Sequence, residues 1–390
     1  MTIPGGTAEL TILEVMEKIC VVVTGTTGIP GGIATLNLNI LMAVQEMAEE
    51  SGAEVEVLSY LDGSGDKPDF LSDRVAFRSF GGGKTRFSTV LARKPMDADL
   101  LLFDHVTLVP PILPLWSLGR PTVVVFGHGS EAWRNVSRTS RWIFRRADLC
   151  LSNSNYTLKK MREAIGQFSG KSCLLGLSPN FDLNNNIDFD VDNDLVLTAV
   201  DGQKHKLKGR VLLLVGRMMA HEPGKGRWPL LQILPDLIAN YRDVQVVFPG
   251  PGNERRELAD FARRLGVGEN VFTPGFVSSD KLDRLYRQCF AYVMPSRQEG
   301  FGLVYLEAMN YAKPCIGCWN DGAQDVIVNN ETGYLVDKGS YRELFDAITA
   351  LLEDPAEARE FGINGFERLH DNFTSAHFRN RLREKLAGLM

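Results

Sequence analysis

Two carboxylates stand eight residues apart in the stretch Ser296–Met309, which reads Ser-Arg-Gln-Glu-Gly-Phe-Gly-Leu-Val-Tyr-Leu-Glu-Ala-Met. Glu299 lies in a glycine-bracketed turn, and Glu307 falls on an expected helix. Carboxylates accept hydrogen bonds from sugar hydroxyls, so Glu307 suits a ribose and Glu299 suits a sugar that is transferred. An isolated pair of this kind is more often a turn cap and an ordinary surface residue. The neighbouring residues therefore have to decide between the two interpretations.

The same stretch predicts a site for a diphosphate. An apolar run at 289–294 is closed by Pro295, so the expected order is strand, glycine turn and helix. First-turn amides of a helix lack intrahelical partners and lie at the positive end of its dipole. The amides expected to face the phosphates belong to Phe301, Gly302, Leu303 and Val304.

A pair of cations follows an expected strand at 211–215, where residues 215–226 read Val-Gly-Arg-Met-Met-Ala-His-Glu-Pro-Gly-Lys-Gly. The strand would deliver the guanidinium of Arg217 and the ammonium of Lys225 to one edge of a cleft. Charge-assisted hydrogen bonds from such groups stabilise a polyanion. A basic pair near glycines is otherwise often solvated surface, so this pattern alone decides little.

The stretch from Glu299 to Glu307 resembles the Glu-x7-Glu signature of retaining family 4 glycosyltransferases, which have the two-domain GT-B fold. The Gly-Arg and Lys-Gly pairs resemble the same family's donor motif in its long-spaced version. The resemblance implies that Arg217 and Lys225 hold the diphosphate of a sugar nucleotide. Phe276 and Val277, which follow Pro274-Gly275, are similar to the family's segment beside the nucleobase.

The resemblance extends to the amino-terminal half. The segment 24–33 follows a strand and resembles the family's first glycine loop, in which Gly31 and Gly32 would let the backbone approach the donor phosphate and the acceptor. His128, after the strand 122–126, resembles the His-Gly element at the floor of the acceptor cleft and is a second catalytic candidate beside Glu299. Its neutral imidazole could donate to a sugar hydroxyl or orient the acceptor, and the plainer alternative is a strand-end histidine bonded to backbone.

Short apolar runs alternate with helical patterns, which predicts an α/β protein with two Rossmann-like domains facing across a cleft. Strands are expected at 19–23, 55–58, 100–103, 122–126, 149–152, 173–175, 211–215, 244–248, 271–273, 291–294, 314–317 and 334–336. The expected domains are an acceptor domain at 1–180, a hinge at 181–208, a nucleotide-sugar domain at 209–372 and a terminal helix at 373–390 that returns to the first domain. Ligands of open α/β sheets bind beyond the carboxyl ends of the strands, where all these motifs fall.

The composition of the chain excludes some classes of binding partner. The 390 residues carry a net charge of −5 and 44% hydrophobic residues, which suits two domains and disfavours nucleic acid. No apolar run has the length of a membrane span, and the first 17 residues lack the parts of a signal peptide. The six cysteines are scattered, and those in Cys-Ile-Gly-Cys (315–318) are expected to be buried thiols. We therefore expect a cytoplasmic protein.

Three alternatives are weaker. The acidic segment 188–194 suggests a calcium loop, but its sixth position is Asn193 rather than glycine and no glutamate closes it. Residues 78–85 resemble the P-loop of a nucleoside triphosphatase, but Arg78 stands where glycine is needed and Phe80 is bulky. A GT-B sugar-nucleotide epimerase or binding protein would keep the fold, although no acids for epimerisation are identified in the first domain.

The family resemblance implies transfer of a hexose, with retention, from a nucleoside diphosphate sugar to a hydroxyl of a growing glycan in polysaccharide biosynthesis. UDP-glucose is the expected donor and GDP-mannose the second choice, and no metal or other cofactor is expected. Arginines alternate with aromatic residues at 133–146, beside an apolar, proline-broken segment at 106–116. A basic aromatic helix of this kind would attract an anionic membrane surface or a lipid-linked acceptor, or would simply pack its aromatic residues inward.

Overall fold

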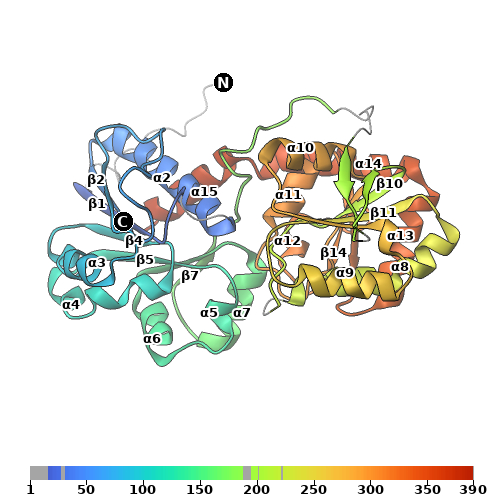
Figure 1. Ribbon diagram of the computed structural model, residues 1–390. Helices are drawn as coiled ribbons and strands as arrows, with labels where there is room; N and C mark the ends of the chain where they lie inside the picture. The colour runs from blue at the N-terminus through green and yellow to red at the C-terminus, as the bar shows by residue number, and fades with distance from the viewer. Residues whose placement is uncertain (1–15, 28–30, 188–194, 201, 221–222, 390) are drawn as a thin grey trace, which may run out of the picture. The chain divides into compact units, whose positions relative to one another are not determined.

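The computed structural model describes residues 16–27, 31–187, 195–200, 202–220 and 223–389 (Figure 1). The chain forms two compact units. Unit 1 comprises residues 1–181 and 373–390, and unit 2 comprises residues 182–372. Each unit has its own parallel sheet with helices packed on it. The expected α/β architecture with two Rossmann-like domains is confirmed.

Unit 1 contains a seven-stranded parallel sheet of order β3-β2-β1-β4-β5-β6-β7. Its strands are β1 (Lys18–Val23), β2 (Glu54–Ser59), β3 (Ala76–Ser79), β4 (Leu100–Phe103), β5 (Thr122–Gly127), β6 (Leu149–Ser152) and β7 (Gly170–Ser172). Its helices are α2 (Gly32–Ser51), α3 (Lys84–Leu91), α4 (Trp116–Gly119), α5 (Ser130–Trp133), α6 (Arg138–Arg146), α7 (Asn155–Ile165) and α15 (Ser375–Ala387), with 3-10 turns η1 (Lys94–Met96), η2 (Val106–Leu108) and η3 (Pro110–Ile112). The four residues of β4 are all apolar and fully buried, as a strand covered on both faces requires.

Unit 2 contains a six-stranded parallel sheet of order β12-β11-β10-β13-β14-β15. Its strands are β10 (Arg210–Leu213), β11 (Val244–Pro249), β12 (Val271–Gly275), β13 (Ala291–Val293), β14 (Cys315–Cys318) and β15 (Gly333–Val336). Its helices are α8 (Arg227–Asn240), α9 (Arg255–Arg264), α10 (Ser279–Gln288), α11 (Leu303–Met309), α12 (Ala323–Val326), α13 (Tyr341–Glu353) and α14 (Pro355–Asn372), with 3-10 turns η4 (Pro223–Lys225) and η5 (Gly268–Asn270). Cys315 and Cys318 are buried free thiols, as expected.

The segment expected as a hinge, 181–208, contributes structure to unit 2. Strands β8 (Val196–Thr198) and β9 (Lys204–Lys206) form an antiparallel hairpin, and Ala199 bridges to Phe272 in β12. The hairpin thereby covers the edge of the parallel sheet. The acidic segment considered as a calcium loop, 188–194, lies outside the described residues.

The apolar run at 173–175 is not a strand. Strand β7 ends at Ser172, and Leu175 and Leu177 are buried farther on, where the Leu177 amide donates to the Phe373 carbonyl at 2.7 Å. A Cβ on Gly176 would collide with the carbonyl of Thr374. The apolar residues of this run therefore pack near the terminal segment instead of extending the sheet. No helix among the described residues is long and apolar enough to cross a membrane.

Candidate active site

Arg217 is presented beyond the end of the central strand β10 by tight backbone packing. The amide of Gly216 donates to the carbonyl of Pro249, the last residue of β11, at 3.1 Å, and the amide of Met218 donates to the carbonyl of Pro251 in the loop that follows, at 2.7 Å. Gly250 and Gly252 in that loop have positive φ angles, and a Cβ on either would collide with the 216–218 backbone. These contacts hold both sides of Arg217 while its side chain remains exposed.

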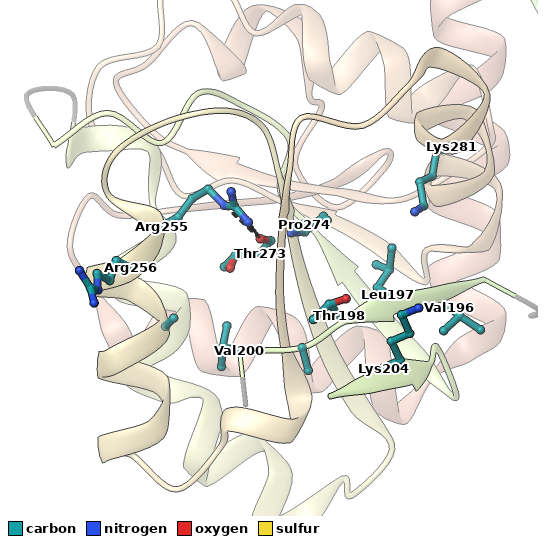
Figure 2. A pocket seen from close by; sticks show the side chains of 12 residues that line it. Val196, Leu197, Thr198, Val200, Lys204, Arg255, Arg256, Thr273, Pro274 and Lys281 are labelled. Atoms are coloured by element: carbon teal, nitrogen blue, oxygen red, sulfur yellow. Dashed lines mark hydrogen bonds between the residues drawn. The ribbon is translucent and has the colours of Figure 1, made fainter. Parts of the chain in front are cut away.

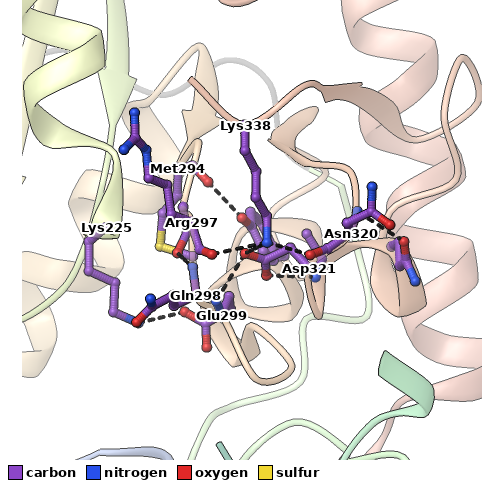
Figure 3. A network of polar contacts seen from close by, with 12 residues as sticks. Lys225, Met294, Arg297, Gln298, Glu299, Asn320, Asp321 and Lys338 are labelled. Atoms are coloured by element: carbon purple, nitrogen blue, oxygen red, sulfur yellow. Dashed lines mark hydrogen bonds and ion pairs between the residues drawn. The ribbon is translucent and has the colours of Figure 1, made fainter. Parts of the chain in front are cut away.

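Lys225 and Glu299 form an ion pair. The Lys225 ammonium lies 2.5 Å from a Glu299 carboxylate oxygen, and both side chains are half-buried (Figure 3). The amide of Arg297 donates to the Gly224 carbonyl at 2.7 Å, which draws the two segments together. A Cβ on Gly226 would come within 2.7 Å of Pro295, so glycine is needed for this approach. In this state the cation that we expect to meet a diphosphate is paired with a carboxylate.

The turn that carries Glu299 is held on both sides of the residue. Its amide donates to an Asp321 carboxylate oxygen at 2.9 Å, and its carbonyl accepts from the Gly322 amide at 2.9 Å. A Cβ on Gly322 would collide with the Gly300 backbone. Residues 321–322 therefore fix the backbone of Glu299 through both its amide and its carbonyl.

Asp321 is a buried acid with an unusual titration. Burial, followed by the charge of Glu299, raises the pKa of its carboxyl to about 7. Lys338 partly compensates, because its ammonium lies 3.8 Å from the Asp321 carboxylate and donates to the carbonyls of Arg297 and Asn320 (Figure 3). These contacts connect the two turns that surround Glu299.

Glu307 lies on α11 and is bonded to a tyrosine. The hydroxyl of Tyr286 donates to its carboxylate at 2.6 Å. Burial raises the pKa of the Glu307 carboxyl, and the tyrosine hydrogen bond opposes this shift. Tyr286 stacks on Tyr311, whose hydroxyl donates to Asp283 at 2.5 Å. A hydrogen bond from this aromatic cluster thus orients the carboxylate that we expect to bind a ribose.

The helix expected at the diphosphate begins later than predicted. Leu303 is its first residue, so Leu303 and Val304 supply first-turn amides, whereas Phe301 and Gly302 precede the helix. Phe301 is buried. Gly302 has a φ of 96°, and a Cβ there would collide with the ring of Tyr305. Glycine is needed here because the backbone is left-handed and packs directly against the Tyr305 ring.

Phe276 and Val277 follow β12, in the connection to α10. The Phe276 side chain is 81% exposed, and Val277 is half-buried. An exposed aromatic ring of this size is available for stacking on a planar ligand.

In unit 1, His128 follows β5 and is 9% exposed. One ring nitrogen is bonded to the Asp104 carbonyl, and the amides of His128 and Gly129 donate to Glu131 at 2.7 and 2.9 Å. Burial alone would raise the pKa of the Glu131 carboxyl, but His128 and these amides bring it below its ordinary value. Burial and His128 lower the pKa of His105, whose ring stacks 6.0 Å from that of His128. The ring of His128 is thus hydrogen-bonded to local backbone, as expected of an ordinary histidine at the end of a strand.

The first glycine loop is tied to the same cluster. Asp104 is buried and accepts from the Thr24 amide and the Asn37 amide group, both at 2.8 Å. Gly31 caps α2 with a φ of 117°, but a Cβ there would meet no atom within 4 Å. Its backbone conformation alone favours glycine at this position. Gly32 is the first residue of α2, and residues 28–30 lie outside the described residues.

The backbone amides of residues 81–83 rule out the P-loop alternative, because they are already bonded within the protein. Residues 80–83 do connect β3 to α3, with Lys84 at the first helical position. However, the amides of Gly81, Gly82 and Gly83 donate to the carbonyls of Asp62, Tyr60 and Phe80 at 2.9, 2.8 and 2.8 Å. A P-loop needs these amides for phosphates. This loop is instead a closed turn.

Comparison with known proteins identifies relatives that share the sequence of unit 2. The family described as Glycosyl transferases group 1 matches residues 199–368. The chain is 29% identical over 283 residues to the GDP-mannose-dependent alpha-(1-6)-phosphatidylinositol monomannoside mannosyltransferase of Mycolicibacterium smegmatis, covering 69% of this chain and 71% of the relative. It is 27% identical to the Mycobacterium tuberculosis protein of that name, covering 64% of this chain and 65% of that relative.

The chain is therefore a glycosyltransferase, of which residues 199–368 match the group 1 family. The fold of Anabaena HepE, solved in complex with UDP and glucose, matches with a TM-score of 0.72 and 19% identity over 95% of this chain and 99% of that one. This glycosyltransferase therefore has the GT-B fold.

Sequence reasoning missed three residues of the glycosyltransferase that contact its candidate site: Tyr286, Asp321 and Lys338. Their partners lie about 20 or more positions away in sequence. The only local signal was the run Asn320-Asp321-Gly322, which is typical of a turn.

Proposed function

We propose that this glycosyltransferase moves a hexose, with retention of configuration, from a nucleoside diphosphate sugar to a hydroxyl of a growing glycan. The single observation that carries the proposal is the Lys225–Glu299 pair. Glu299 follows strand β13 and the exposed Arg217 follows the adjacent strand β10, so both lie beyond the carboxyl ends of neighbouring strands. A cation and a carboxylate in contact suit a diphosphate next to a sugar.

Arg217 and Lys225, with the amides of Leu303 and Val304, stabilise the leaving diphosphate in this proposal. The bond from the anomeric carbon to phosphate breaks, the acceptor oxygen bonds to that carbon from the same face, and the acceptor proton goes to the leaving phosphate oxygen. Glu299 orients the transferred sugar, and no metal is required. His128 contacts a hydroxyl of the sugar or the acceptor.

Glu307 and the Phe276–Val277 segment hold the nucleoside in this proposal. UDP-glucose is the first donor to test, supported by family usage and by the UDP and glucose bound to Anabaena HepE. GDP-mannose is the second, supported by the names of the mycobacterial relatives. The exposed Phe276 ring suits stacking on either base.

The donor test is a thermal-shift titration with UDP-glucose and GDP-mannose, each with and without EDTA. One donor should raise the melting temperature in both conditions. Arg217→Ala should lower turnover by roughly two to three orders of magnitude, as loss of a preorganised charge donor does. A folded Arg217→Ala variant with wild-type turnover would refute the assignment, and a shift seen only with metal would refute metal independence.

We further propose that helix α6 and its surroundings bind an anionic membrane that carries a lipid-linked acceptor in polysaccharide biosynthesis, as a peripheral protein at the cytoplasmic face. Ile143 and Phe144 pack into unit 1, while Trp142 remains 49% exposed among arginines. Trp142 packs edge-on against Trp116, and Leu118 on α4 is 69% exposed. Basic side chains around exposed apolar ones match an anionic lipid surface.

Vesicles of phosphatidylcholine, with and without phosphatidylglycerol, test this surface. Sedimentation at low salt should recover the wild type only with the anionic vesicles. Arg138→Glu with Arg141→Glu should abolish recovery, whereas Lys159→Glu with Arg74→Glu, an equal charge change elsewhere on unit 1, should not. Equal recovery of both double variants would contradict the proposal.

A further inference from the structure

A cavity of about 770 Å³ opens at the outer edge of the sheet in unit 2 (Figure 2). Its walls are the β8–β9 hairpin, the end of β12 and helices α9 and α10. Arg217, Lys225 and Glu299 do not line it. The hairpin that the sequence suggested was a hinge therefore helps to enclose a second concave site.

The cavity is strongly basic. Lys204, Arg255, Arg256 and Lys281 are among its lining residues, and none of the described lining residues is a carboxylate. Figure 2 shows the ammonium groups of Lys204 and Lys281 pointing toward one another from the hairpin and from α10. The whole chain carries a net charge of −5, so this concentration of cations is not a reflection of composition. Like charges gathered in one cavity repel, and a bound anion relieves that repulsion.

One of these cations is fixed in place. The guanidinium of Arg255 donates to the Thr273 carbonyl through two nitrogens, at 3.1 and 2.5 Å. A Cβ on Gly275 would lie 2.7 Å from its third nitrogen, so the chain leaves room for the guanidinium at this position. A planar guanidinium that is already positioned loses little entropy when it binds a phosphate.

The buried acid that precedes Arg255 in sequence is bonded to other residues. Glu254, which precedes α9, bonds to the buried Arg227 at 2.8 Å and to the Trp228 ring nitrogen at 2.6 Å. It therefore cannot neutralise the cavity. The remaining walls are mixed: Leu197 and Val200 are buried and apolar, and Thr198 and Thr273 add hydroxyls. Pockets of about 300–1,000 Å³ with a few placed polar groups are typical of small-molecule sites.

We propose that this cavity binds a small phosphorylated molecule at a site separate from the sugar donor. Its phosphate lies among Lys204, Arg255 and Lys281, and its uncharged part lies against Leu197 and Pro274. The proposal does not depend on the donor assignment, because the two sites share no residue.

Calorimetric titration with inorganic pyrophosphate in EDTA tests the site. We use a Lys225→Ala background, so that the proposed donor site contributes little. In that background Lys204→Glu with Lys281→Glu should weaken the remaining binding at least tenfold. Lys206→Glu is the matched control for Lys204→Glu alone, because the two make the same charge change on the same strand but only Lys204 lines the cavity. Lys204→Gln with Lys281→Gln should give a smaller loss and guards against misfolding caused by the glutamates.

The outcomes separate the two sites. Pyrophosphate binding that is equal in the Lys204/Lys281 variants and in the Lys206 control would overturn the cavity proposal. If Lys225→Ala binds pyrophosphate as the wild type does while the Lys204/Lys281 variants lose it, the donor assignment fails and the cavity proposal stands.

Discussion

Asp321 helps to hold Glu299 in position. It is fully buried and accepts the Glu299 amide, and Asp321→Ala would leave that amide without its acceptor. We expect a loss of stability of about 1–3 kcal/mol and weaker donor binding. Chemical denaturation and the thermal shift with donor measure both effects. Asp325→Ala on the half-buried next turn is the control, and equal losses in the two variants would contradict a specific role for Asp321.

The titration of Asp321 predicts a dependence of stability on pH. Its pKa of about 7 in the folded protein lies above the ordinary aspartate pKa of 3.8, so the folded state binds this proton more tightly than the unfolded state. Stability from this group is therefore full at low pH and is lost as pH rises from about 4 to 7, at up to about 1.4 kcal/mol per pH unit. Asp321→Asn keeps an oxygen acceptor and removes the proton. The free energy of unfolding of Asp321→Asn minus that of the wild type should increase as pH rises from about 4 to 7. A difference that is constant across this range would refute the raised pKa of Asp321.

At the residue level, sequence could identify the groups whose spacing carries a signature and could not identify their supports. Lys225 and Glu299 were predicted from local motifs and are in contact. Asp321 and Lys338 act on backbone groups of distant turns, and a hydrogen bond to a distant backbone amide leaves no mark on local sequence. The delayed start of α11 follows from the left-handed turn at Gly302, which a pattern of apolar residues does not reveal.

Among the elements, the loops after β10 and β11 depend on each other. Gly252 has a φ of 151°, and an added Cβ would collide with the Met218 backbone beside Arg217. Gly252→Ala should therefore displace Arg217 and reduce turnover by about tenfold or more, because small displacements of positioned groups are costly. Steady-state kinetics give the effect, and Gly266→Ala is the control, since its φ is also positive but its Cβ would meet no atom within 4 Å. If Gly252→Ala is less stable than Gly266→Ala but has the same turnover, the collision affects folding only and the prediction for Arg217 is wrong.

Sequence predicted most strands of both sheets because buried parallel strands are continuous apolar runs. It failed where apolar residues serve another purpose, as at Cys173–Leu175, or where a strand is short and polar. The hairpin β8–β9 contains Lys204, His205 and Lys206, and its position depends on the edge of β12. Such a strand is stabilised by its neighbours and has no periodic signal of its own.

On the scale of the molecule, unit 1 is built from two separate parts of the chain. Helix α15 packs on α2, with Arg379 2.8 Å from Glu46 and Arg383 paired with Glu50. Phe378, Leu382 and Leu386 are buried on its inner face. Removing residues 375–390 should cost unit 1 about 5 kcal/mol or more, given about 1.5–3 kcal/mol for each buried side chain. Calorimetry should then detect an early transition for unit 1, and an unchanged thermogram would contradict this.

The pairing of α15 with α2 also sets an order of events during synthesis. A ribosome makes residues 182–372 before it makes α15, so unit 2 has all its residues while unit 1 still lacks a helix. Chains usually fold from the amino terminus as they emerge, but here the first unit to be started is the last to be completed. Until then the apolar face of α2 that α15 covers is exposed to chaperones and to other nascent chains.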